Sequence, residues 1–170
     1  MGGTCAVDLT VMHPDMFSVF EDIAGDLAPT VGTKDQTVAR LFGGDANAWA
    51  AFDPTTVITK HGQYRGMSGW FAISNSPPTQ FARRTADANA VGLGGRDGGG
   101  NPGDQTAAAN SLCALGKEHG IDCAVVATPG KHDWPFATQA FANSLPWLAG
   151  QLGTPSAPRI PLPGSAAAGQ

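Results

Sequence analysis

The chain has 170 residues, of which 42% are hydrophobic and 14% are charged, and its formal net charge at pH 7 is −4. This length and composition suit one domain with a buried core, and they exclude a chain that is disordered throughout. The negative charge disfavours nucleic acid as a partner, because proteins that bind phosphate backbones present a basic surface. No apolar run approaches the ~20 residues that a membrane-spanning helix requires.

The predicted elements alternate between helices and strands along the chain, which favours an α/β fold with a mostly parallel sheet flanked by helices. The composition divides the chain into a domain over residues 1–152 and a disordered tail over 153–170, which is rich in Pro, Ala and Gly. In chain order, the hydrophobic spacing predicts a helix over residues 6–13, a strand over 16–20, a loop over 21–35, short helices over 36–42 and 46–52, strands over 69–74 and 88–93, a helix over 105–119, a strand over 121–127 and a last helix over 136–152.

Three cysteines, Cys5, Cys113 and Cys123, exclude a fully paired disulfide framework, and no Cys-x-x-Cys pair indicates a metal or redox site. Cys113 and Cys123 fall at the end of a predicted helix and the start of a predicted strand. Two interpretations fit this spacing: a disulfide formed in an oxidising compartment, or two buried thiols that pack as small hydrophobic side chains.

Two loops that follow predicted strands carry residues suited to nucleophilic catalysis. In parallel sheets, ligands bind at the carboxyl ends of the strands. The loop after residue 93 carries Asp97, and the loop after Ala127 carries His132. An aspartate and a histidine in such loops could support a nucleophile, with the histidine moving the proton and the acid fixing its tautomer. Asp104 is a rival for the acid, although it also fits the N-cap of the helix that follows.

Each of these residues also has a structural interpretation. A histidine beside an aromatic residue is more often a packed loop residue, and an aspartate in a Gly-rich loop is more often a turn former. The other histidines, His13, His61 and His119, are interpreted as structural or solvated. A metal site at His132 and Asp133 is disfavoured, because no second cluster has the spacing of metal ligands. No metal and no cofactor are predicted.

The first residues fit the second half of a nucleophile elbow, Gly-x-Ser-x-Gly, on a sharp turn into a helix. In this alignment the serine would stand immediately before Met1, and Gly2 would be the closing glycine. The backbone N–H of Met1 would then be one donor of the oxyanion hole. No serine within the chain has an elbow pattern around it.

With these motifs, the sequence resembles the esterase-D and mycolyltransferase-like branch of the α/β-hydrolase superfamily over most of residues 1–152. The pieces that carry the resemblance are Met1-Gly2-Gly3, His13-Pro14-Asp15-Met16-Phe17, Asp22-Ile23-Ala24-Gly25, Trp49-Ala50-Ala51-Phe52-Asp53-Pro54, Gly69-Trp70-Phe71, Gly130-Lys131-His132-Asp133-Trp134 and Leu145-Pro146-Trp147-Leu148.

The resemblance implies the C-terminal part of an α/β-hydrolase fold and serine esterase or acyltransferase chemistry on a small-molecule or lipid ester. His132 would act as general base and then acid, with Asp97 or Asp104 as the acid of the triad. Because the serine would lie upstream of Met1, we expect the chain alone to be inactive. The alternative is a non-catalytic pseudo-hydrolase fragment that binds an acyl or glycan ligand. The sequence does not fix the compartment; an upstream signal would imply export or the cell envelope.

Overall fold

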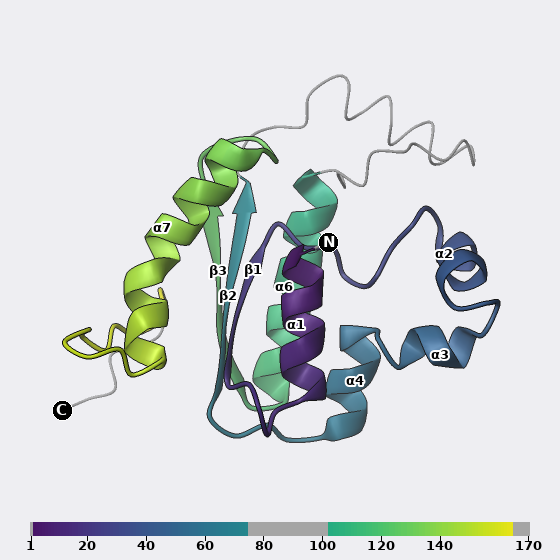
Figure 1. Cartoon of the computed structure of the whole chain (residues 1–170), viewed down its shortest axis with the longest axis horizontal. Helices are drawn as coiled ribbons and strands as arrows, with labels where there is room; N and C mark the ends of the chain where they lie inside the picture. The colour runs from purple at the N-terminus through teal and green to yellow at the C-terminus, as the bar shows by residue number, and fades with distance from the viewer. Residues whose placement is uncertain (1, 75–101, 165–170) are drawn as a thin grey trace.

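The computed structural model describes residues 2–74 and 102–164 of the chain. Within these ranges, a sheet of three parallel strands is flanked by helices (Figure 1). The strands are β1 (Val19–Ile23), β2 (Met67–Ser74) and β3 (Ile121–Thr128), and they lie side by side in chain order. This arrangement confirms the predicted α/β class with a parallel sheet.

Helices cover both faces of the sheet. Helices α1, α4 and α6 lie on one face, and α7 lies on the other (Figure 1). Neighbouring residues of β2 point to opposite faces. Phe71 packs in the first core cluster, which includes Val11 and Leu112, while Trp70 and Ala72 pack in the second core cluster, which includes Phe136 and Trp147. The helices are α1 (Gly2–Met12), α2 (Lys34–Leu41), α3 (Ala46–Ala50), α4 (Pro54–His61), α6 (Pro102–Glu118) and α7 (Trp134–Gln151).

Aspartates start several of these helices by accepting hydrogen bonds from free backbone N–H groups. Asp45 begins α3, and Asp133 begins α7. Asp53 does the same for α4, a helix that is not among the predicted elements. The predicted helix over 46–52 stops just before Asp53-Pro54, a pair that is typical of a helix end, whereas proline is also favoured in the first turn of a new helix.

Two predicted boundaries were wrong. The first strand spans Val19–Ile23, not 16–20, because the chain turns after α1 and leaves Met16 70% exposed. Asp104 lies within the first turn of α6 rather than at its N-cap, since that helix already begins at Pro102. The strand expected over 88–93 and most of the Gly-rich loop after it lie outside the described residues.

Up to Gly164, the segment after α7 also differs from the disordered tail that its composition predicts. Leu162 is only 4% exposed and packs in the second core cluster with Trp70 and Trp147. The backbone of Pro158 passes so close to Gly150 that a Cβ there would lie 2.5 Å from the carbonyl oxygen. Residues 165–170 lie outside the described part of the chain.

A disulfide joins Cys113 in α6 to Cys123 in β3, which selects one of the two interpretations left open above. Cys5 is exposed and free. Over residues 2–74 and 102–164, none of the helices combines the length and apolar character needed to cross a bilayer.

Candidate functional site

The loops at the carboxyl ends of the strands lie at one edge of the sheet, because the strands are parallel. The first turns of α1, α6 and α7 also point to this edge, toward which the strand arrows run (Figure 1). His132 lies here, in the loop between β3 and α7. Of the other predicted site residues, Met1 and Asp97 lie outside the described residues, as does the side chain of Asp104.

The loop that carries His132 is fixed on both sides. On one side, the hydroxyl of Ser74, at the end of β2, donates a hydrogen bond to the carbonyl oxygen of Gly130. Gly130 has a positive φ of 133°, which favours glycine. On the other side, the Asp133 carboxylate accepts a hydrogen bond from the N–H of Phe136 at 3.0 Å and starts α7. His132 is therefore held between two anchored neighbours although it is exposed.

The ring of His132 contacts a buried side chain of α6. Its Nδ1 atom lies 3.0 Å from Nε2 and 3.2 Å from Oε1 of Gln105, which is only 2% exposed. Nδ1 therefore faces a neutral amide that can either accept a hydrogen bond from it, through Oε1, or donate one to it, through Nε2. A histidine engaged at Nδ1 can serve as a base through Nε2.

Gln105 is not among the predicted site residues; in the sequence it is only the first residue of the predicted helix over 105–119. Glutamine is common in helices, and nothing in its neighbours marks it as a buried partner of a residue 27 positions away. Only the packing of α6 beside the loop after β3 reveals the contact.

A buried carboxylate at the end of β1 supports the first turn of α1. Oδ1 of Asp22 accepts a hydrogen bond from the N–H of Gly25 at 2.6 Å. A Cβ on Gly3 or on Gly25 would overlap this carboxylate. Burial raises the pKa of Asp22 to about 6, although the Gly25 hydrogen bond opposes the shift. Gly3 therefore permits the close packing that the elbow interpretation requires of this turn.

The side chain of Thr4 fixes the same turn. The N–H of Asp26 donates to Oγ1 of Thr4 at 2.9 Å, and the Thr4 hydroxyl lies 3.2 Å from the carbonyl oxygen of Asp26. Together with Asp22, this pair attaches the start of α1 to the loop after β1.

The other histidines have local surroundings that fit their structural interpretation. Nδ1 of His119 lies 2.6 Å from the carbonyl oxygen of Gly62, and the ring of His61 stacks on Tyr64. His13 is exposed just after α1. Among the described residues, no three His, Cys, Asp or Glu side chains are grouped so that they could hold a metal ion.

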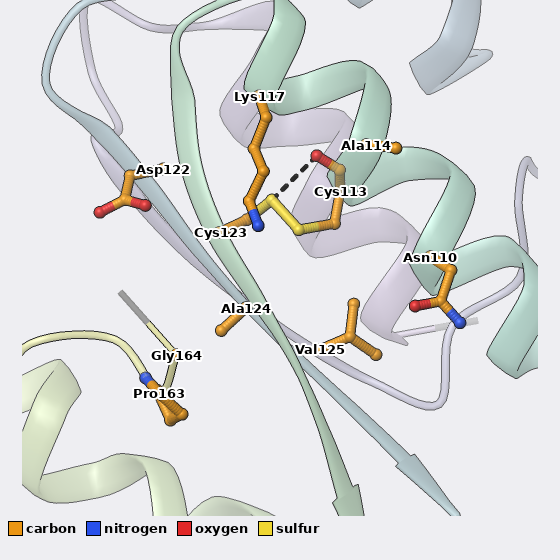
Figure 2. Close-up of a pocket in the computed structure, with 10 residues that line it drawn as sticks. All are labelled: Asn110, Cys113, Ala114, Lys117, Asp122, Cys123, Ala124, Val125, Pro163 and Gly164. Atoms are coloured by element: carbon orange, nitrogen blue, oxygen red, sulfur yellow. Dashed lines mark hydrogen bonds between the residues drawn. A yellow bond between two sulfur atoms is a disulfide. The ribbon is translucent and has the colours of Figure 1, made fainter. Parts of the chain in front are cut away.

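A groove of about 440 Å³ lies between α6, β3 and the C-terminal segment (Figure 2). It runs along Asp122–Val125, upstream of the strand end from which the His132 loop departs. Its lining includes none of the predicted site residues, so it is distinct from the candidate site. The lining residues are Asn110, Cys113, Ala114, Lys117, Asp122, Cys123, Ala124, Val125, Pro163 and Gly164.

The chain is similar to an uncharacterized protein of Corynebacterium glutamicum, with 30% identity over 149 residues. This match covers 87% of the chain but only 30% of that protein, so the chain spans less than a third of its relative's length. No family model matches the sequence. No solved structure matches it either.

Proposed function

We propose that this chain is the histidine-bearing C-terminal part of a serine esterase or acyltransferase, in the esterase-D and mycolyltransferase-like branch of the α/β-hydrolase superfamily. The observation that carries the proposal is the setting of His132: exposed, directly after the third parallel strand, and engaged at Nδ1 by a buried side chain. A general base needs this combination of a fixed ring and an accessible second nitrogen.

In the proposed reaction, a serine N-terminal to α1 attacks the acyl carbonyl of a small-molecule or lipid ester. His132 takes the serine proton and returns it to the oxygen of the departing alcohol, which leaves an acyl-enzyme. Water or another hydroxyl then attacks the acyl group and passes its proton to His132, which returns it to the serine oxygen as the acyl–serine bond breaks. By the resemblance, the N–H of Met1 is an oxyanion donor, and Asp97 or its rival Asp104 is the acid.

The packing at the start of α1 supports a nucleophile turn at this position. The Asp22 carboxylate lies against Gly3, and Thr4 is bonded to Asp26, so the first turn of α1 has firm support from β1 and from the loop after it. A catalytic serine needs such support because its oxygen must keep a fixed position relative to the histidine.

The test uses the longest in-frame polypeptide that contains this sequence, treated with a fluorophosphonate and assayed with p-nitrophenyl esters. We expect labelling of a serine immediately before Met1, and loss of hydrolysis in His132→Ala but not in the control His13→Ala. Absence of labelling, or full activity in His132→Ala, would overturn the proposal and favour the non-catalytic alternative. Hydrolysis by the 170-residue chain alone that His132→Ala abolishes would contradict the upstream serine.

The acid is assigned by a second pair of variants in the same polypeptide. Asp97→Asn should lower kcat strongly if Asp97 stabilises the positive charge that His132 takes up during the reaction. Asp104→Asn should mainly cost about 1 kcal/mol of helix stability, as expected for an acidic side chain in the first turn of a helix. The opposite pattern would reassign the acid to Asp104.

A further inference from the structure

We propose that Gln105, rather than the acid of the triad, is the residue that positions the ring of His132 and fixes its tautomer: Oε1 of Gln105 accepts a hydrogen bond from Nδ1–H, which leaves Nε2 as the basic nitrogen. The acid keeps the other role, which is to stabilise the positive charge that the ring takes up. This inference deepens the proposed function and rests on it for its catalytic meaning. The claim that the ring of His132 is held in one tautomer can be tested without measuring any reaction.

The contact between Gln105 and His132 joins a buried, ordered side chain to an exposed one. Gln105 is almost fully buried in α6, and both of its amide atoms lie within 3.2 Å of Nδ1. A buried glutamine side chain has lost its rotamer freedom on folding, so an additional hydrogen bond orders it at little further entropic cost. An exposed histidine, by contrast, rotates freely unless a partner holds it.

The chemistry of a general base decides which amide atom holds the ring. To take a proton through Nε2, a neutral imidazole must carry its own proton on Nδ1, and this proton needs an acceptor. Oε1 supplies one. The opposite arrangement, with the amide N–H donating to Nδ1, would place the proton on Nε2 and block it as a base.

The elements that carry the two residues are also joined to each other. The disulfide between Cys113 and Cys123 ties α6 to β3, the helix that carries Gln105 to the strand that leads to His132. The first anchor of the His132 loop, at Gly130, comes from Ser74 of β2. These links restrict relative movement of the glutamine and the histidine.

The test is long-range ¹⁵N–¹H NMR of the 170-residue chain at a pH where its histidines are neutral. We expect His132 to show one tautomer, with the proton on Nδ1. Gln105→Met, which keeps the length of the side chain but removes the amide, should mix the two tautomers. Gln105→Glu, which keeps an acceptor oxygen, should restore the Nδ1–H form. Gln139→Met, at an exposed glutamine of α7, is the matched control and should leave the signals of His132 unchanged.

His119 is an internal reference, because its Nδ1 faces the carbonyl oxygen of Gly62 and must carry the proton in every variant. An Nε2–H tautomer of His132 in the parent chain would overturn the inference, as would an unchanged tautomer in Gln105→Met. If Gln105→Met fails to fold, the parent chain and Gln105→Glu still decide the outcome. Failure of the fluorophosphonate test with a fixed Nδ1–H tautomer would refute the esterase proposal alone.

Discussion

The carboxyl groups of Asp8 in α1 and Asp53 at the start of α4 repel each other in the packed region between these helices. Both residues are buried, but their partners differ. Asp53 accepts hydrogen bonds from the N–H and the hydroxyl of Thr56, whereas Oδ1 of Asp8 has no hydrogen-bond partner among the described residues. Burial, and secondly the charge of Asp53, raise the pKa of Asp8 to about 7.

Asp8→Asn should stabilise the fold in a pH-dependent way. Between the ordinary pKa of 3.8 in the unfolded chain and about 7 in the folded chain, the folded state binds more protons at Asp8. The contribution of Asp8 to the free energy of unfolding therefore falls as pH rises through this window. The gain from Asp8→Asn should grow from pH 5 to pH 8 and reach roughly 1–3 kcal/mol.

Urea unfolding at four pH values in this range measures the effect of Asp8→Asn. Asp15→Asn, at an exposed aspartate just after α1, is the control and should give a small and constant difference. A gain from Asp8→Asn that does not change with pH would show that the Asp8 carboxylate carries no such penalty.

Gly3→Ala should destabilise the protein, because the new methyl group would overlap the buried Asp22 carboxylate. We expect the free energy of unfolding to fall by about 1–3 kcal/mol, as for other overpacked sites. Gly2→Ala is the matched control, since a Cβ there meets nothing within 4 Å and alanine favours helix. Equal effects of the two substitutions in thermal unfolding would refute this account of the α1 start.

Replacing both Cys113 and Cys123 with serine should lower the free energy of unfolding by about 3 kcal/mol, from the lost restraint on the unfolded chain. Cys5→Ser is the control and should have little effect, because Cys5 is exposed and free. Dithiothreitol should destabilise the parent chain and the Cys5→Ser variant but not the double variant. Insensitivity of the parent chain to the reductant would argue against the disulfide.

Leu162→Ala should cost roughly 2–4 kcal/mol, the range for truncating a buried leucine. Its side chain covers the core cluster that contains Trp70 and Trp147. Ile160→Ala, two residues earlier and 37% exposed, should cost much less. The fluorescence of the tryptophans during unfolding reports on both variants, and similar losses would mean that the segment after α7 does not belong to the core.

Sequence patterns predicted the parts of the fold that depend on local chemistry. The apolar run of β3 and the helical pattern of α6 follow from residue order alone, and the sequence also predicted β2, whose end anchors the loop of the candidate site. Contacts between residues that are far apart in the sequence were harder to predict. The contact between Gln105 and His132 depends on packing between distant segments, and Leu162 lies in a stretch whose composition is typical of a disordered tail. The start of α4 was not predicted because Asp53-Pro54 can either end one helix or begin the next.

The strand pairing bears on how the chain folds. Val19 pairs with Ser68, and Met67 pairs with Ile121, so each of these ladders joins segments that are far apart in the sequence. Their hydrogen bonds form only after long loops have closed, which slows folding relative to a fold built on local contacts. Helix α6 and strand β3, by contrast, are neighbours in the sequence and share many contacts. Their contacts therefore require a shorter loop to close than the contacts of either ladder.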